Sequence, residues 1–552
     1  MANKKSTKYI FVVGGVMSGV GKGVTTASIA KILQSKGFKV SVLKADPYLN
    51  VDAGTMNPTE HGEVFVLDSG LECDQDMGNY ERFLDVSLPE DNYMTNGMIF
   101  KHVIDKERAL GYKGKCVEPI YHITEEILRR IKTSAQKTNA EITLIEIGGT
   151  IGEYQNAIFI EAARVLRIKN IKDVMTVMVS YLPVPQTIGE MKTKPTQNAV
   201  RQLNSYGVTP DLIIARSSYP LDAKRKDKIA DSTGIEAKDV ISAPDIESIY
   251  DVPINFENDA LSTRILSHFG LRPRQKDLKE WRAMVAKMKK ADKPVKIAIV
   301  GKYFDTGDFI LSDAYISVIE AIKFSSYGIG VKPDIHWLSS KDFESDDKKL
   351  SNLKDYDGII VPGGFGETGI EGKINVIQYA RENKIPYFGL CYGMQLMVIE
   401  YARHVLGIET AHTVEIDPDT PNPVIDIMPD QKKKLAEKDY GGSMRLGGYQ
   451  ALLKKGTIAY KAYGKGEIRE RHRHRYEVNP EYIEKLSSRD LIFSGVSPDG
   501  TLMEIAELPT KIHPFFLGVQ FHPEFLARPL SPHPLFSAFI KASLGRSTKN
   551  KS

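Results

Sequence analysis

The chain has 552 residues, of which 42% are hydrophobic and 26% are charged, values typical of a soluble globular protein. This length is too great for one compact core and predicts two large domains or three smaller ones. The 74 basic and 70 acidic residues leave a net charge of only +4, which argues against a dedicated nucleic-acid-binding protein.

Cysteine content and hydropathy indicate the environment. The three cysteines, Cys73, Cys116 and Cys391, are too few for a disulfide framework or a four-cysteine metal site and are typical of a reducing cytosol. No stretch of 18 or more apolar residues occurs, so we expect no membrane-spanning segment. We therefore expect a cytoplasmic protein without a membrane partner.

The first half of the chain alternates short apolar runs with helical patterns. The run at 9–13 follows several lysines, as in a signal peptide, but it is too short for the apolar core of one. We interpret it as a buried strand, with a signal peptide as the weaker alternative. Further apolar runs lie at 39–43, 142–147, 174–180 and 211–215, and helical patterns at 25–35 and 124–133. Such alternation predicts an α/β fold with a doubly wound parallel sheet.

A change of pattern near residues 271–294 indicates a boundary. Leu278, Trp281, Val285 and Met288 recur at helical spacing among lysines, which favours a connecting helix over a membrane or calmodulin-type helix. Apolar runs at 295–300, 358–361, 386–390 and 517–521 predict a second α/β domain. We expect domains at 1–270 and 295–546, a linker helix at 271–294 and a disordered tail at 547–552.

A glycine-rich segment at 14–26 follows the first predicted strand and precedes a helix. Its glycines allow backbone N–H groups to turn toward phosphate oxygens, and Lys22 can reach the terminal phosphates of a nucleotide. The match to G-x-x-x-x-G-K-[ST] is imperfect, because Gly15 lies one place early and Gly23 replaces the hydroxyl residue. The alternative is a tight glycine turn with a solvated lysine.

Carboxylates near this loop are candidate magnesium ligands. Asp74 and Asp76 lie in one acidic segment, and Glu146 ends a predicted strand just before two glycines, where α/β sheets place ligand groups. Taken singly, each carboxylate is equally compatible with a helix cap or an ion pair.

The second domain carries a candidate cysteine nucleophile. Residues 386–395 read as a strand, Cys391 and a helix, a nucleophile elbow with sulfur in place of oxygen, and the helix start favours a thiolate. His522 would take the thiol proton, oriented by Glu524 two residues on along the same face of a strand. The glycine turn at 361–366 offers backbone N–H groups for an oxyanion hole. A buried structural thiol is the alternative for Cys391 alone.

These motifs carry a family resemblance. In PGGFG, GLCYGMQ and FHPE, the second domain resembles a class I glutamine amidotransferase. The first domain resembles the synthase half of the CTP synthase family in FVVGGVMSGVGKG, KADPYLNVDAGTMNPTEHGEVFV, DMGNYERF, EIGGTIG and GEMKTKPTQ, joined by RHRHRYEVN in the second. The resemblance implies a P-loop-type synthase domain followed by a glutamine amidotransferase α/β domain.

The resemblance also implies an activity. Such an enzyme is a ligase of pyrimidine biosynthesis that converts UTP, ATP and glutamine to CTP, ADP, phosphate and glutamate. ATP would phosphorylate O4 of the uracil ring, and ammonia released by Cys391 and His522 would reach the first domain and displace the phosphate. Mg²⁺ would be the cofactor, GTP an allosteric activator and CTP a feedback inhibitor. The protein would be a homotetramer able to form filaments.

Matching motif positions imply the binding residues. The ATP set is Gly19, Val20, Gly21, Lys22, Gly23, Val24 and Asp76, with Asp76 and Glu146 binding magnesium. The UTP and CTP set is Ser18, Glu153, Tyr154, Gln155, Lys192, Thr193, Lys194, Pro195, Thr196, Gln197 and Lys228. The glutamine set is Gly364, Tyr392, Gly393, Met394, Gln395, Glu415 and Arg475. Without the resemblance, an exposed lysine loop is the simpler interpretation of 192–195, and the basic run at 471–475 alone is weak evidence for nucleic acid.

Two departures from the family bear on regulation. Glu153-Tyr154-Gln155 carries one acidic residue where two are common, which leaves the strength of CTP feedback open. The loop after Tyr303 is longer than usual, which leaves the GTP response open. Two other functions are compatible with parts of the sequence. A cobyrinate-type amidoligase is disfavoured by KTKPTQ and RHRHRYE, and a scaffold ATPase with an inert second domain would not need Cys391, His522 and Glu524.

Overall fold

The computed structural model describes residues 6–187, 189–275, 278–301, 312–345, 347–364, 366–428, 431 and 441–549. The chain divides into two compact units. Unit 1 comprises Met1–Asp52 and Asn79–Val285, and unit 2 comprises Ala53–Gly78 and Ala286–Ser552. The segment 53–78 thus packs with the C-terminal half of the chain. The domain boundaries expected from the sequence stay a prediction, since packing units need not coincide with functional domains.

Unit 1 is built on a parallel sheet, as its apolar runs predict. In the described part of this unit, seven strands lie in the order β5-β2-β6-β1-β7-β8-β9, and every neighbouring pair is parallel. Their bounds are β5 Tyr93–Thr95, β2 Val40–Asp46, β6 Ile142–Ile147, β1 Lys8–Gly14, β7 Val174–Tyr181, β8 Leu212–Ser217 and β9 Val240–Pro244. The chain order reverses beside β1, and ligands bind at such switch points beyond the carboxyl ends of the strands.

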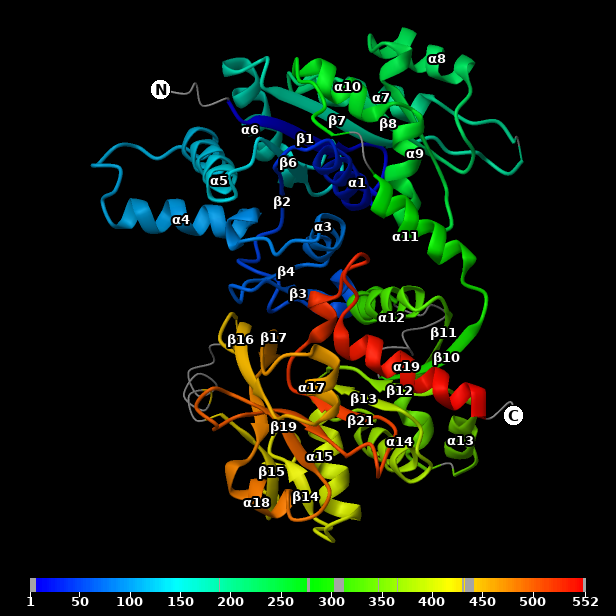
Figure 1. Ribbon diagram of the computed structural model, residues 1–552. Helices are drawn as coiled ribbons and strands as arrows, with labels where there is room; N and C mark the ends of the chain where they lie inside the picture. Colours follow the sequence, from blue (N-terminus) through cyan, green and yellow to red (C-terminus); the bar gives the residue numbers. More distant parts are fainter. Residues whose placement is uncertain are drawn as a thin grey trace. The chain divides into compact units, whose positions relative to one another are not determined.

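Helices cover both faces of this sheet (Figure 1), which is why its strands are almost continuously apolar. One face packs against α4 (Asn96–Arg108), α5 (Thr124–Lys137), α6 (Ala157–Lys169), α7 (Lys194–Ser205) and α8 (Ala223–Thr233). The other helices of the unit are α1 (Lys22–Ser35), α9 (Val252–Asn258), α10 (Leu261–His268) and most of α3 (Asp76–Leu84) and α11 (Lys279–Lys290). Helix α1 packs on α9 and α10. The predicted doubly wound fold is confirmed.

The expected linker helix is α11. Its apolar stripe is buried at Trp281 and Val285, and the Trp281 indole N–H donates to Tyr250 O at 2.8 Å. The stripe therefore packs against unit 1, as a connecting helix requires.

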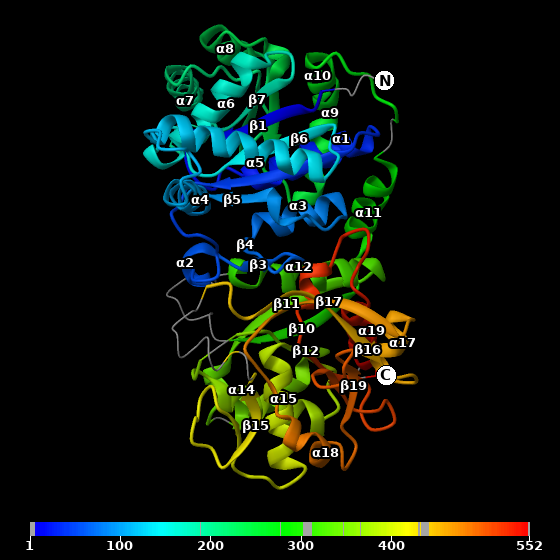
Figure 2. The ribbon, with the colours of Figure 1, turned by 90° about the vertical axis from the view of Figure 1, so that its left-hand side faces the viewer.

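Unit 2 has a mixed sheet that Figure 2 shows from the side. Among its described residues, nine strands lie in the order β11-β10-β12-β13-β21-β20-β19-β16-β17. Their bounds are β11 Lys332–Ser339, β10 Pro294–Gly301, β12 Gly358–Val361, β13 Tyr387–Leu390, β21 Phe516–Val519, β20 Met503–Glu507, β19 Ile492–Val496, β16 Arg445–Leu453 and β17 Glu467–His474. The first five are parallel and the last four pair antiparallel. The four apolar runs expected from the sequence correspond to β10, β12, β13 and β21 of the parallel part, and no expected run corresponds to the antiparallel strands.

The remaining elements of unit 2 complete its layers. The helices are α12 (Ile316–Gly328), α13 (Asp347–Ser351), α14 (Ile370–Glu382), α15 (Tyr392–His404), α17 (Ile458–Tyr463), α18 (Ile483–Leu486) and α19 (Pro534–Lys549), with the short α2 (Pro58–His61) in the segment 53–78. A three-stranded sheet joins β14 (Ala411–Thr413), β15 (Asn422–Ile427) and β18 (Tyr476–Val478), and a hairpin joins β3 (Val64–Val66) and β4 (Glu72–Asp74).

The hairpin β3–β4 is held to unit 2 by arginines of β17. Arg469 makes a two-pronged contact with Asp68 at 3.0 and 2.9 Å, and Arg473 Nε donates to Glu72 at 2.8 Å. The fully buried Arg471 donates to the carbonyl of Val66 at 3.0 Å. The basic run that could have suggested nucleic acid is thus largely used inside the protein.

Two sequence expectations concern membranes and the GTP response. Over the described residues, no helix is both long and apolar enough to cross a bilayer. The loop after Tyr303 lies largely outside the described residues, and so does much of the expected tail.

Candidate active sites

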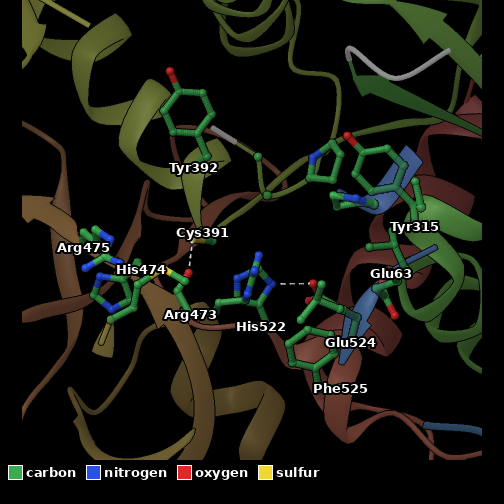
Figure 3. A pocket seen from close by; sticks show the side chains of 18 of the residues that line it. Glu63, Tyr315, Cys391, Tyr392, Arg473, His474, Arg475, His522, Glu524 and Phe525 are labelled. Carbon is green, nitrogen blue, oxygen red and sulfur yellow. Dashed lines mark hydrogen bonds and ion pairs between the residues drawn. The ribbon is translucent and has the colours of Figure 1, made fainter. Parts of the chain in front are cut away.

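The nucleophile elbow lies in unit 2 between β13 and α15. Cys391 has φ of 49° and ψ of −101°, a strained backbone for a residue with a side chain, as at the nucleophiles of elbow-type hydrolases. The turn requires small neighbours, because a Cβ on Gly393 would lie 2.2 Å from the carbonyl oxygen of Val361. The Cys391 thiol donates to the carbonyl oxygen of Arg473 at 3.7 Å (Figure 3).

His522 and Glu524 meet beside the thiol. His522 Nδ1 lies 2.7 Å from Glu524 Oε1, which fixes Nδ1 as the protonated nitrogen. His522 Nε2 is buried and has no hydrogen-bond partner in the described part of the chain. A side chain on Gly363 would lie 2.9 Å from His522 Cε1, so the glycine turn is part of the imidazole's packing.

The expectation that His522 and Glu524 share a face of one strand is wrong. Strand β21 ends at Val519, and Glu524 lies in a 3-10 turn, Pro523–Leu526, that begins directly after His522. Pro523 has no N–H to continue a sheet ladder and fits the first turn of a helix. The turn, rather than strand alternation, brings the carboxylate back to the imidazole.

The charge of His522 follows from its neighbours. Burial opposes protonation, but the negative charges of Glu524 and of Cys391 as a thiolate, together with the hydrogen bond from Nδ1 to Glu524, outweigh it and raise the pKa of His522 to about 10. The imidazole is therefore protonated at neutral pH and can serve as a proton donor.

A cavity of about 400 Å³ opens over Cys391. Of the expected glutamine-binding residues, it is lined by Gly364, Tyr392, Gln395, Glu415 and Arg475. Met394 and Gly393 are buried at the start of α15 and do not line it. Glu63 and Val64 of the segment 53–78 also line the cavity; they lie in a motif that was assigned to the first domain and were not among the expected glutamine-binding residues.

The polar ends of the cavity are held in place by neighbours. Arg475 donates to Gln431 at 2.8 Å and to Ser443 at 2.9 Å. Glu415 accepts from the backbone N–H of Gly366 at 3.1 Å. A guanidinium and a carboxylate presented in one cavity can bind the carboxylate and the ammonium group of an amino acid.

In unit 1 the glycine-rich loop joins β1 to α1. Gly21, the residue before α1, has φ of 87°, a left-handed conformation that favours glycine. Lys22 Nζ donates to the carbonyl oxygen of Gly149 at 2.8 Å, so the lysine lies over the loop. The predicted order of strand, loop, lysine and helix is confirmed.

A cavity of about 220 Å³ adjoins this loop. It is lined by Gly21, Val24 and Thr25 together with residues of β8, β9, the turn after β9 and α9, among them Arg216, Asp245, Ile249 and Phe256. Arg216 pairs with Asp245 at 2.7 Å, and a Cβ on Gly21 would lie 2.6 Å from its guanidinium. Arg216 was not among the residues expected from the sequence, because no motif marks it.

Glu146 ends β6 in a buried ionic cluster. Its Oε1 accepts from Lys44 at 2.9 Å and its Oε2 from the Tyr80 hydroxyl at 2.5 Å. Lys44 also lies 3.6 Å from Asp46. Lys44 was not among the residues expected from the sequence. Asp76 begins α3 and belongs to unit 2, so the two expected magnesium ligands come from different units.

The expected UTP and CTP residues lie on several elements of unit 1. Glu153 accepts from the N–H of Thr150 at 2.9 Å and from Gln155 at 2.9 Å, and Tyr154 is 98% exposed. Lys192 pairs with Glu190 at 2.7 Å, and the positive charge of Lys228 on α8 also acts on Glu190.

The rest of this set surrounds the start of α7. Thr193 precedes the helix and Lys194 and Pro195 open it. Gln197 donates to the Thr193 hydroxyl at 3.1 Å, and the Thr196 hydroxyl lies 2.8 Å from that of Ser180. Ser18 of this set lies elsewhere, in the glycine-rich loop, and Val20 and Gly23 of the ATP set lie in or next to that loop. Ser18 and Gly19 are exposed.

Comparison with known proteins identifies both halves of the chain. A family model described as CTP synthase N-terminus matches residues 8–271, and one described as glutamine amidotransferase class-I matches residues 310–542. The CTP synthase of Pyrococcus abyssi is 50% identical over 541 residues, which cover 97% of this chain and 98% of that protein. That of Geobacillus kaustophilus is 46% identical over 539 residues, covering 98% and 99%. The solved glutaminase domain of Trypanosoma brucei CTPS with bound acivicin is 37% identical and covers 46% of this chain and 94% of that chain, with a TM-score of 0.42.

Proposed function

We propose a division of labour for this chain, which belongs to the CTP synthase family. The chain is a glutamine-hydrolysing ligase that aminates UTP to CTP. Unit 2 releases ammonia from glutamine, and the nucleotide-binding elements of unit 1 use it. The observation that carries this assignment is that relatives of this family match almost the entire chain while Cys391, His522 and Glu524 meet at one cavity.

The glutaminase reaction follows from the geometry at Cys391. The sulfur attacks the side-chain amide carbon of glutamine, and backbone N–H groups of Gly364 and Tyr392 stabilise the oxyanion. Protonated His522 donates its proton to the departing nitrogen, and ammonia leaves a thioester. His522 then removes a proton from water, which hydrolyses the thioester to glutamate. Arg475 and Glu415, with Gln395, hold the two charged ends of the substrate.

The synthase reaction begins with ATP at the glycine-rich loop. Backbone N–H groups of residues 19–24 face the phosphates and Lys22 exchanges the Gly149 carbonyl for phosphate oxygens. Arg216 adds a second cation beside the loop, in a cavity whose size suits the purine ring. The γ-phosphoryl group moves to O4 of UTP, and ammonia displaces the phosphate at C4.

Magnesium is the proposed cofactor of this half. The buried Glu146 already faces a cation, the ammonium group of Lys44, so its carboxylate fits a metal ligand. Mg²⁺ typically takes one or two carboxylates and completes its shell with phosphate oxygens and water, which suits Glu146 as the ligand that unit 1 supplies. When bound, the ion neutralises charge on the transferred phosphoryl group.

UTP and the product CTP share a site in this proposal. Lys192, Lys194 and Lys228 would neutralise the triphosphate, and the start of α7 would receive its oxygens. Glu153 and Gln155 would contact the pyrimidine nucleotide on the side where CTP acts as a feedback inhibitor. GTP is the proposed activator. The proposed assembly is a cytoplasmic homotetramer that can form filaments.

The decisive experiment follows CTP formation by its absorbance, with UTP, ATP, magnesium or glutamine omitted in turn. Omission of any one should abolish the signal, and ammonium chloride should replace glutamine. Cys391→Ala should lose glutamine-driven CTP formation and retain the ammonia-driven reaction, because only the sulfur nucleophile is removed. Loss of both reactions would contradict the division of labour.

A further inference from the structure

A buried glutamine lies behind the nucleophile, outside the expected glutamine-binding set. Gln520 follows β21, is 1% exposed, and directs its side-chain Nε2 at Cys391 Sγ over 3.7 Å. The backbone holds both residues close, since Cys391 N donates to Val519 O at 2.7 Å and Gln520 N donates to Glu504 O at 2.9 Å.

The orientation of the Gln520 amide is set by a chain of hydrogen bonds. A backbone carbonyl can only accept, so the contact of Gln395 with Tyr476 O at 2.8 Å must involve the Gln395 amino group. That same amino group lies 3.3 Å from Gln520 Oε1. The oxygen of Gln520 is therefore the acceptor on this side, and its amino group is left to face the sulfur.

The Arg473 carbonyl makes this donor important. In the thiol form, Cys391 donates to that carbonyl. Once the proton has left, the same oxygen faces a negative sulfur and favours return of the proton. An N–H group directed at the sulfur has the opposite effect, because a hydrogen bond to the charged form stabilises it.

We propose that Gln520 is a catalytic residue of the glutaminase reaction, whose side-chain N–H stabilises the Cys391 thiolate against the neighbouring Arg473 carbonyl, with Gln395 as the positioning residue that sets its direction. This inference rests on the proposed function of Cys391 as nucleophile. It gives Gln395 a role through Gln520 in addition to any contact with substrate.

Other charges in the cavity act on the sulfur as well. They are those of the ion pair His522 and Glu524 and those of Glu63, Glu415, Arg473 and Arg475. His474 also lines the cavity, but burial and the charge of Arg445 lower its pKa well below the usual value, so its imidazole is neutral. The start of α15 adds the positive end of a helix dipole. The test must therefore remove the Gln520 donor while leaving these groups in place.

The experiment measures the rate of Cys391 alkylation by iodoacetamide between pH 5 and 10 in the full-length enzyme, together with glutaminase kinetics. Gln520→Met keeps the side-chain length and removes the donor. We expect the midpoint of the alkylation profile to rise by roughly one pH unit and kcat/KM for glutamine to fall about tenfold through kcat. Ammonia-driven CTP formation should stay unchanged.

A second variant and a control keep the result interpretable. Gln520→Glu preserves the side-chain volume but places a hydrogen-bond acceptor against the sulfur, so it should raise the midpoint of the alkylation profile further than Gln520→Met does. If the Gln520→Met variant does not fold, the Gln520→Glu variant provides the test. Gln450→Met, at an exposed glutamine of β16 bonded only to Glu467 among the described contacts, should match the wild type. A folded Gln520 variant with a wild-type midpoint would overturn the inference, whereas glutamine-driven activity in Cys391→Ala would overturn the proposed function itself.

Discussion

At the scale of single residues, the catalytic proton sits on a histidine between two negative groups. His522 is buried, yet Glu524 on one side and Cys391 on the other raise its pKa to about 10. An imidazolium is the form that can protonate departing ammonia, and it is lost as the pH rises through that pKa. The geometry therefore keeps His522 protonated, and able to act as the general acid of glutamine hydrolysis, at pH values well above neutral.

This electrostatic arrangement leads to a test with Glu524→Gln. The change keeps a hydrogen-bond acceptor for His522 Nδ1 but removes the negative charge, so the pKa of His522 should fall by roughly 1–3 units. The alkaline limb of kcat/KM for glutamine, near pH 10 in the wild type, should move down accordingly. Steady-state glutaminase assays from pH 6 to 11 measure it.

The matched control is Glu467→Gln, at an exposed glutamate of β17. It removes the same charge from the same unit away from the imidazole and should leave the alkaline limb in place. If Glu524→Gln also left it in place, the carboxylate would not be the group that holds the proton on His522.

At the scale of elements, the carboxyl end of β8 lines the cavity beside the glycine-rich loop. Arg216 lies against Gly21, and its Nε has no hydrogen-bond partner among the described residues. The start of α1 offers partial positive charge to phosphate, and a guanidinium beside it strengthens that field. Strand β8 thus places a cation beside the proposed phosphate site, although its sequence carries no nucleotide motif.

We predict that Arg216→Met raises KM for ATP about tenfold, since a hydrogen bond to a charged group contributes about 1.5–3 kcal/mol and 1.4 kcal/mol is a factor of ten. The effect should be equal in glutamine-driven and ammonia-driven CTP formation, because ATP serves both. Glutamine hydrolysis without nucleotides should not change.

Lys172→Met serves as the control for this variant. Lys172 is exposed and precedes β7 at the amino end of the parallel sheet, the edge opposite to the nucleotide loop. Its KM for ATP should equal that of the wild type. An unchanged KM in Arg216→Met would remove the guanidinium from the ATP site.

The elements predicted from sequence are those whose signal is local. Parallel strands that are covered on both faces consist of nearly continuous apolar residues, so β1, β6 and β7 could be located from the apolar runs in the sequence alone. The glycine-rich loop, the cysteine elbow and His522 with Glu524 are compact motifs, and the structure brings Cys391, His522 and Glu524 to one cavity.

The antiparallel half of unit 2 could not be found in the same way. Strand β17 reads Glu-Ile-Arg-Glu-Arg-His-Arg-His, which resembles a solvated charge run. Arg471 is nevertheless fully buried, because its acceptor, the carbonyl of Val66, comes from a segment about 400 residues earlier. Arg216 and Gln520 escaped notice for the same reason: their partners are distant in sequence.

At the scale of the whole molecule, the segment 53–78 is an N-terminal part of a C-terminal unit. Its hairpin supplies Asp68, Val66 and Glu72 to three arginines of β17. Phe65 packs edge-on against Phe525 with ring centroids 5.0 Å apart. A buried cation that loses its partner is strongly destabilising, so unit 2 should not reach full stability from its C-terminal residues alone.

A fragment of residues 286–552 tests this dependence. It should unfold at a lower temperature than unit 2 does in the full chain, because Arg471 and Arg473 lose their acceptors. A synthetic peptide of residues 53–78, added at about 100 times its Kd, should raise the Tm of the fragment by roughly 5–10 °C, since binding at that excess contributes about 2.7 kcal/mol. Differential scanning calorimetry measures both effects.

The control peptide carries Asp68→Asn and Glu72→Gln, which keep its size and remove the two carboxylates that pair with Arg469 and Arg473. It should raise the Tm much less, because only the Val66 carbonyl and the packing of Phe65 remain. Arg473 also supplies the carbonyl that faces the Cys391 thiol, so the native peptide should in addition alter the rate of Cys391 alkylation in the fragment. A fragment that matches the full chain in Tm and alkylation rate without any peptide would show that the hairpin is dispensable for the glutaminase site.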